Sequence, residues 1–231
     1  MKTFWIVLAA IAVALIVPFF LPKPPGAPEN PNLNLPWQIT QLPDGNIEVF
    51  GLTPGTSTLF DAQRELGTDR ELAVMAEPNE TGRLEAYWPS LTTGFVQGKL
   101  FLSFDLPAAD IEALKKRAVD ISRTQSAGKK YTLAQADALA AESLRFGTLT
   151  LRPSGKIDEA TLFARFGQPT ETLTSGKEET ENRFTHYLYP DKGLAIERDP
   201  KGKVVLQYVA PADFGRIIRT PLLAGKEASH D

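Results

Sequence analysis

Residues 157–210 carry the sequence pattern from which the fold is predicted, and a second version of this pattern occurs earlier in the chain. In the later copy, residues 157–171 read IDEATLFARFGQPTE, residues 186–196 read HYLYPDKGLAI and residues 199–210 read DPKGKVVLQYVA. In the earlier copy, residues 56–71 read TSTLFDAQRELGTDRE, residues 86–96 read AYWPSLTTGFV and residues 97–106 read QGKLFLSFDL. Gly67 corresponds to Gly167, and Trp88-Pro89 correspond to Tyr189-Pro190. An internal repeat of this kind predicts one structural unit that is built twice.

Each copy has the pattern of a short helix followed by antiparallel strands. Thr58 and Asp158 stand where a helix N-cap is expected, because their side-chain oxygens can accept hydrogen bonds from the first turn. Gly67 and Gly167 follow as C-caps. The later strands alternate apolar and other residues, which is typical of strands with one face on a core.

Composition sets wide limits on function. The chain has 231 residues, a formal net charge of -3 and no cysteine. The absence of cysteine excludes disulfides, thiolate metal sites and cysteine nucleophiles. An acidic chain with a pI of about 5.6 lacks the basic surface of a nucleic-acid-binding protein.

The N-terminal segment is strongly apolar. Residues 4–21 read FWIVLAAIAVALIVPFFL and carry no charge. As a helix they would reach about 27 Å, close to the ~30 Å hydrocarbon core of a bilayer. Bulky residues at the end of the segment favour an uncleaved anchor, with a cleaved signal peptide as the alternative. With Lys2 before the span, we predict a single-pass inner-membrane protein with a cytoplasmic N-terminus and a periplasmic C-terminal domain.

We therefore predict an α+β fold of two tandem units of short helices packed on antiparallel sheet, preceded by one transmembrane helix. The predicted order is a transmembrane anchor (1–21), a proline-rich linker (22–36), a first unit (37–106), a helical insertion (107–148), a second unit (149–214) and a tail (215–231). In the insertion, Thr132 and Gln135 predict a capping box for a second helix.

The second copy resembles a known family. Asp158, the run from Phe166 to Pro169, the tyrosine-rich segment 186–189 and the glycine hairpin 201–205 are similar to the BamE (SmpA/OmlA) family of outer-membrane-assembly lipoproteins. Two such units in tandem also resemble the architecture of the β-lactamase-inhibitor protein. The resemblance implies helices packed on antiparallel sheet and a role in the cell envelope.

Motifs for catalysis are absent from the sequence. His186 and His230 are the only histidines, and no nucleophile elbow, HExxH spacing or glycine-rich phosphate loop occurs. We therefore predict no catalytic residue, no cofactor, no metal ligand and no enzymatic activity.

Aromatic residues give the functional hypothesis. Tyr87, Trp88 and Phe95 in the first copy and Tyr187, Tyr189 and Tyr208 in the second occur at corresponding strand positions. Rigid aromatic side chains on a sheet provide contact area at low entropic cost. We expect a non-catalytic envelope module that binds a protein partner through an aromatic sheet face. The alternatives are an enzyme or small-ligand binder with a pocket between the units near His186, and an inhibitor of a secreted hydrolase.

Overall fold

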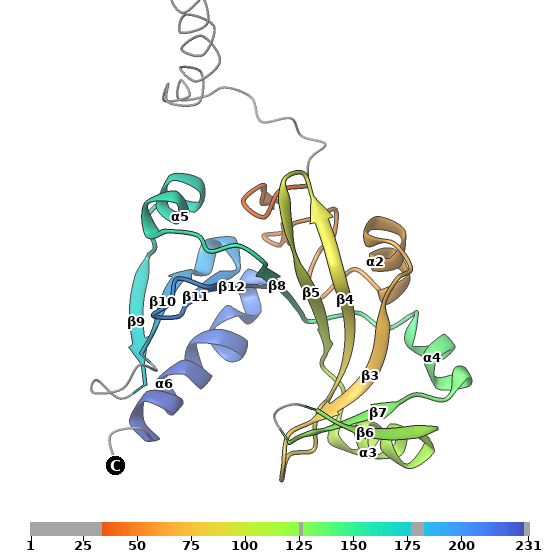
Figure 1. The fold of residues 1–231 in the computed structure, drawn as a ribbon. Coiled ribbons are helices and arrows are strands. Elements are labelled where there is room, and N and C mark those ends of the chain that lie inside the picture. Colours follow the sequence, from red (N-terminus) through yellow and green to blue (C-terminus); the bar gives the residue numbers. More distant parts are fainter. Residues whose placement is uncertain (1–33, 125–126, 177–182, 229–231) are drawn as a thin grey trace, which may run out of the picture. The chain divides into compact units, whose positions relative to one another are not determined.

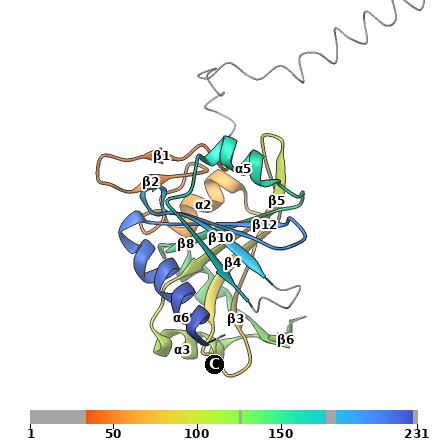
Figure 2. The same cartoon turned by 90° about the vertical axis from the view of Figure 1, so that its left-hand side faces the viewer.

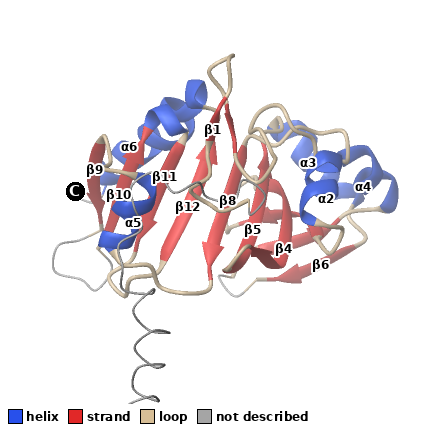
Figure 3. Cartoon of the chain, turned by 90° about the horizontal axis from the view of Figure 1, so that it is seen from above, coloured by secondary structure: helices blue, strands red, loops and turns tan. Residues whose placement is uncertain are grey.

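One antiparallel sheet of ten strands dominates the fold of this chain. The computed structural model describes residues 34–124, 127–176 and 183–228. The strands lie side by side (Figure 3) in the order β6 (Asp120–Arg123), β7 (Lys129–Thr132), β3 (Glu71–Ala76), β4 (Arg83–Thr93), β5 (Val96–Phe104), β8 (Thr148–Pro153), β12 (Val204–Val209), β11 (Leu194–Arg198), β10 (Phe184–Tyr189) and β9 (Glu171–Ser175). A separate two-stranded hairpin consists of β1 (Thr40–Gln41) and β2 (Ile47–Glu48).

The helices cover the two faces of the sheet unequally (Figure 1). The described helices are α2 (Leu59–Leu66), α3 (Ala108–Arg117), α4 (Gln135–Ala141), α5 (Glu159–Phe166) and α6 (Thr220–Ala228), the last preceded by a π-helical turn (Gly215–Arg219). Helices α2 to α5 each contribute to the larger of two hydrophobic clusters. The turn before α6 contributes to a smaller cluster on the other face of the sheet, with Leu188 and Ala195.

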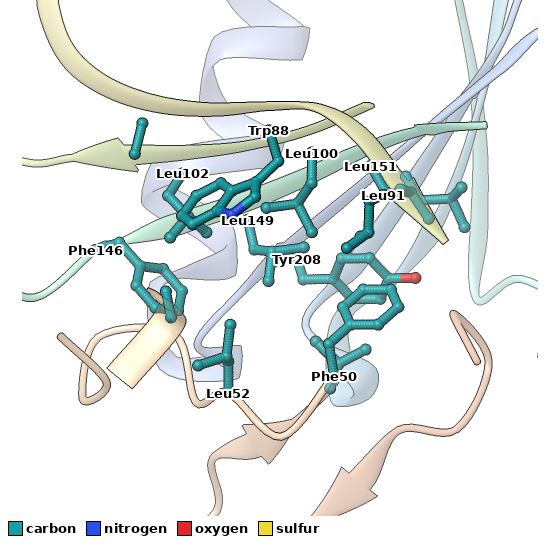
Figure 4. Close-up of a cluster of buried hydrophobic side chains, with 14 of the residues drawn as sticks. Phe50, Leu52, Trp88, Leu91, Leu100, Leu102, Phe146, Leu149, Leu151 and Tyr208 are labelled. Atoms are coloured by element: carbon teal, nitrogen blue, oxygen red, sulfur yellow. The ribbon is translucent and has the colours of Figure 1, made fainter. Parts of the chain in front are cut away.

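The larger cluster forms along the middle strands (Figure 4). It takes alternate residues from each strand because successive side chains point to opposite faces of a sheet. Leu100 and Leu102 of β5 face Leu151 and Leu149 of β8, which in turn face Leu206 and Tyr208 of β12. All six side chains are almost completely buried. We call the face that carries them the core face.

Local signals place helices α2 and α5. The Thr58 hydroxyl accepts a hydrogen bond from the Asp61 amide, and the Asp158 carboxylate accepts one from the Thr161 amide. Each helix ends at a glycine with positive φ, 91° at Gly67 and 81° at Gly167, where a residue with a Cβ would be strained. The caps predicted from sequence at both ends of both helices are confirmed.

A side chain donates a hydrogen bond to the carbonyl oxygen of each of these glycines, and we call this contact the tie. The Trp88 indole nitrogen donates to the Gly67 carbonyl at 2.8 Å, and the Tyr189 hydroxyl donates to the Gly167 carbonyl at 3.0 Å. Both donors lie on strands that follow their helix, so each tie fixes the end of a helix to the sheet. The similarity between the two copies is therefore visible in this local contact.

The predicted fold of two tandem helix-on-sheet units is wrong. Residues 34–124, 127–176 and 183–228 belong to one compact unit, and ten of the strands described there form a single sheet with few helices. The reason is β8, which pairs with β5 along one edge and with β12 along the other, so no sheet boundary separates the copies.

The membrane part of the fold prediction is also corrected. No helix in the described ranges of the chain is long and apolar enough to cross a membrane. Residues 4–21, on which the predicted transmembrane helix was based, lie outside those ranges. The fold of the described residues therefore does not include the predicted transmembrane helix.

The segment between the copies differs from a purely helical insertion. Residues 107–148 contain α3 and α4, but also the hairpin β6–β7, which extends the sheet by pairing with β3. Thr132 lies in β7, and α4 starts after Ala134 without a side-chain cap, so the predicted capping box is wrong. Thr132 pairs with Ala73 and Asp120 instead, because strand pairing satisfies its backbone.

We predict that replacing Trp88 by Phe lowers the free energy of unfolding by about 2–4 kcal/mol. The change leaves a cavity at a fully buried site and removes the donor to the Gly67 carbonyl. Tyr87→Phe is the control, since it removes only a hydroxyl from the other face and should cost under about 0.5 kcal/mol. Denaturant unfolding measures both, and equal losses in the two variants would contradict the tie.

Candidate functional site

Three of the five aromatic residues predicted to bind a partner lie inside the core face. Trp88 is 1% exposed, and Tyr187 and Tyr189 are each 3% exposed. Their polar atoms are occupied internally, since the Tyr187 hydroxyl donates to the Glu159 carboxylate at 2.6 Å. Burial and this hydrogen bond raise the pKa of Tyr187 to about 12. These three residues stabilise the fold and present no ring to a partner.

Tyr87 and Phe95, the other two predicted residues, are accessible but lie apart. Tyr87 points to the face of β4 opposite the core face. Phe95 lies at the turn between β4 and β5, is 69% exposed, and has its ring centroid 5.6 Å from that of Trp37. The structure therefore does not bring the five predicted residues together at one surface.

A different aromatic group surrounds Tyr87. The Tyr87 ring stacks on the ring of Phe101, its partner on β5, with centroids 4.7 Å apart and 22° between the planes. The Lys99 ammonium lies 6.0 Å from the Tyr87 centroid, and the Arg152 guanidinium lies 5.4 Å from the Phe101 centroid. Lys99 and Arg152 are paired across β5 and β8, so the two cations lie next to each other beside the stacked rings, both of them on exposed residues. We call the surface formed by these four residues the open face.

The open face is the part of the sheet that α6 does not cover. Figures 1 and 2 show α6 beside the strands at the β9 end of the sheet. Its position is fixed by two arginines in the preceding turn: Arg216 pairs with Asp105 at 3.0 Å, and Arg219 with Glu171 at 3.0 Å. Beyond α6, strands β4, β5 and β8 carry the four residues of the open face.

Hollows adjoin the open face on two sides. One, of about 460 Å³, is lined by Lys99 and Arg152 together with Glu197 and Lys203. Another, of about 340 Å³, lies between Ser103 of β5 and the start of α6. A convex feature of a bound molecule could therefore enter on either side of the stacked rings.

Two carboxylates border the same surface. Burial raises the pKa of Glu85, an effect that the nearby charges of Arg83 and Arg152 partly oppose. Burial likewise raises the pKa of Glu197, again opposed by Arg152. The charge of Arg152 therefore lowers the pKa of both carboxylates, against the effect of burial.

His186, the residue of the alternative hypothesis, lies on β10 beneath α6. Its Nε2 atom is 2.7 Å from the Ser175 hydroxyl, and its Nδ1 atom is 3.9 Å from the Glu197 carboxylate. The adjoining hollow, of about 240 Å³, is closed on the other side by apolar residues such as Ile218 and Leu222. The separation of 3.9 Å is too long for a hydrogen bond that would orient a general base. The enzyme alternative stays untested.

Sequence reasoning found Tyr87 but missed Phe101, Lys99 and Arg152. Alternation along 99–106 places Phe101 opposite the core, and that signal was available. The register that sets Phe101 beside Tyr87, and Lys99 beside Arg152, depends on pairing between distant strands. No local pattern in the sequence encodes that register.

We predict that His186 makes the protein less stable as the pH falls below about 6.5. Burial lowers the pKa of His186 from its ordinary value of 6.5. The unfolded chain therefore takes up a proton at this site before the folded chain does, and stability decreases with falling pH. Between pH 7.5 and 5.5 the wild type should lose more stability than His186→Asn. If denaturant unfolding at the two pH values shows that the wild type and His186→Asn lose the same amount of stability, the prediction is contradicted.

Comparisons with known proteins do not assign this chain to a family. No protein-family model matches this chain, and neither does any curated protein or any solved structure. The resemblance to the outer-membrane-assembly lipoproteins and to the β-lactamase-inhibitor architecture stays a prediction from the sequence. A function for the chain has to rest on the geometry of its own surfaces.

Proposed function

We propose that this chain is a non-catalytic protein-binding module and that the open face is its binding surface. The observation that carries the proposal is the stacked pair of Tyr87 and Phe101 beside the neighbouring cations of Lys99 and Arg152. Of the five residues predicted from the sequence to bind a partner, the proposed surface contains only Tyr87.

The open face has the physical properties of an interface centre. Tyr and Arg are enriched among residues that dominate binding energy, and they act best when their conformation is fixed beforehand. Here the rings of Tyr87 and Phe101 lie on strands of a ten-stranded sheet, and each ring restricts the conformation of the other by stacking. A partner therefore gains contact area with little loss of side-chain freedom.

The charges favour a particular kind of partner. Lys99 and Arg152 place two positive charges side by side next to the aromatic pair, and both residues are exposed, whereas Glu85 and Glu197 are partly buried. The more accessible charges next to the rings are therefore positive. We expect a protein loop that presents an apolar side chain next to one or more carboxylates.

A polypeptide suits the shape better than a small ligand. The hollows on the two sides of the rings are separate and open, so a compact molecule would fill only one of them. A loop can cross the stacked rings and place side chains in both. The start of α6 and the turn before it line one of these hollows and would form one wall for such a loop.

The cellular setting rests on different residues. We expect the partner to belong to the bacterial cell envelope, and the chain to lie in the inner membrane with its C-terminal part in the periplasm. Both expectations are predictions from residues 4–21. Those residues lie outside the described part of the chain.

Site-specific photo-crosslinking tests the proposal. We predict that p-azidophenylalanine in place of Tyr87 gives a discrete covalent adduct with one protein in an extract of the native host cells. The same group in place of Phe60, which is 57% exposed on α2, is the matched control and should give no such adduct. Adding Lys99→Glu or Phe101→Ala to the Tyr87 probe should reduce the adduct about tenfold.

The outcome that contradicts the proposal is equally specific. Identical adducts from the Tyr87 and Phe60 probes, or an adduct unaffected by both substitutions, would show that the open face is not the binding surface. Denaturant unfolding of each variant verifies that the sheet is intact.

A further inference from the structure

We propose that the β6 edge of the sheet is a homodimer interface, in which β6 pairs antiparallel with β6 of a second copy of this chain. Strand β6 lies at one end of the ten-stranded sheet (Figure 3), and among the described strands it pairs only with β7. An edge strand carries a row of backbone donors and acceptors that can pair with another chain. The proposal goes beyond the proposed function and concerns a different part of the sheet.

The backbone groups that face outward from β6 are those of Ile121 and Arg123. The Thr124 amide donates to the Gly128 carbonyl at 3.0 Å, so the backbone of Thr124 faces β7. Antiparallel pairing alternates between residues that exchange hydrogen bonds and residues that do not, and the register continues this alternation to Ser122. The amide and carbonyl groups of Ile121 and Arg123 therefore point away from β7.

The core face of the sheet is apolar as far as this edge. Ile121 pairs with Tyr131, Tyr131 with Val74 and Val74 with Leu84, so one row of core-face residues runs from the larger hydrophobic cluster to β6. Val74 and Leu84 are fully buried, whereas Ile121 is 58% exposed. Val119, directly before β6, is 68% exposed. The row therefore ends in water at an apolar side chain, and a second copy would cover it.

A two-fold axis at Ile121 gives a consistent register for two β6 strands. An axis perpendicular to the sheet keeps the core faces of both copies on the same side, and it sets one outward-facing residue opposite itself. With Ile121 at the axis, its amide would donate to the carbonyl of Ile121 in the second copy, and the two side chains would cover each other. An axis at Arg123 would instead set two arginines opposite each other, which is unfavourable.

The charges on the other face complement each other in the register centred on Ile121. Asp120 would lie opposite Ser122 of the second copy, and Ser122 is paired with Lys130 of β7. Two strand spacings are about 10 Å, so a lysine side chain can extend over the short serine to the carboxylate of Asp120. Lys130 already pairs with Glu71 of its own chain and would then lie between two carboxylates. The same contact would form on both sides of the axis.

The other end of the sheet does not offer the same interface. Figures 1 and 2 show α6 beside the strands at the β9 end, and Arg219 pairs with Glu171 of β9 at 3.0 Å. Leu173, in the middle of β9, is partly buried against the smaller hydrophobic cluster. Of the two end strands, β6 is the one whose central apolar side chain is exposed.

Cysteine crosslinking tests the proposal, because the chain contains no cysteine of its own. Residues that exchange hydrogen bonds in an antiparallel pair have their Cα atoms about 5.5 Å apart, within the range of about 4.4–6.8 Å that a disulfide spans. We expect Ile121→Cys to give a disulfide-linked dimer under mild oxidation. The full chain is used in a non-ionic detergent, because residues 4–21 are apolar.

Two single-cysteine variants are the matched controls for this experiment. Ser122→Cys changes the adjacent residue, which would be a diagonal neighbour of Ser122 in the second copy at about 7–8 Å, too far for a disulfide. Leu139→Cys reports random collisions, since Leu139 is comparably exposed, 60%, on α4. We expect the Ile121→Cys dimer to form about tenfold faster than either control.

Analytical ultracentrifugation in the same detergent measures the association without a crosslink. We expect the wild-type chain to form a dimer, and Ile121→Lys to raise its dissociation constant at least about tenfold, because two like charges would meet at the axis. Ile121→Val keeps an apolar side chain and should stay close to the wild type. Denaturant unfolding verifies that each variant is folded.

Several outcomes would overturn the proposal. A monomeric wild type, or crosslinking of Ile121→Cys no faster than of both controls, would show that β6 does not pair with itself. A dimer that Ile121→Lys leaves intact would place the association elsewhere in the chain. Oxidation in an extract of the host cells that links Ile121→Cys to a different protein, and not to itself, would assign the edge to that protein instead. None of these results bears on the Tyr87 probe, so this proposal and the proposed function can fail independently.

Discussion

The pairing of β8 along both of its edges holds the two copies of the repeat in one sheet. The β8 residues Leu149 and Leu151 are almost completely buried between the leucines of β5 and the Leu206 and Tyr208 side chains of β12. A buried leucine contributes roughly 1.5–3 kcal/mol to stability by leaving water. The hydrogen bonds to β5 and β12 satisfy the backbone of β8 on both sides. Through this one strand the two copies of the repeat share a core and a sheet.

A continuous sheet has consequences for the proposed binding surface. The helices α2 to α5 lie on the core face, and the α6 region covers only part of the other face. The uncovered part, around Tyr87 and Phe101, is consequently backed by the rigid core and cannot collapse onto it.

Local features of the fold could be predicted from the sequence, whereas long-range ones could not. Thr58, Asp158, Gly67 and Gly167 act through neighbours within a few residues, so their roles as caps are encoded locally. The pairing of β8 with β12 joins segments more than fifty residues apart, and nothing in either strand specifies its partner. The two-unit fold followed from reading the repeat as two separate sheets.

The candidate site shows the same limit at the level of single residues. Tyr87 and Trp88 are adjacent, so alternation requires one of them to face the core and the other to face away. A shift of one residue in register exchanges the two faces, and the sequence does not determine which holds. Trp88, Tyr187 and Tyr189 were therefore assigned to a binding face although they stabilise the core. Phe101 and Arg152 join Tyr87 only through pairing across β4, β5 and β8.

The central claim, that β8 joins both halves into one cooperative sheet, is tested most directly by native-state hydrogen exchange. The claim predicts that slowly exchanging amides in β4, β8 and β10 all exchange with the same free energy, equal to that of global unfolding. If the amides of β10 instead exchanged at a distinctly lower free energy than those of β4, the halves would unfold separately and the single-sheet account would be contradicted.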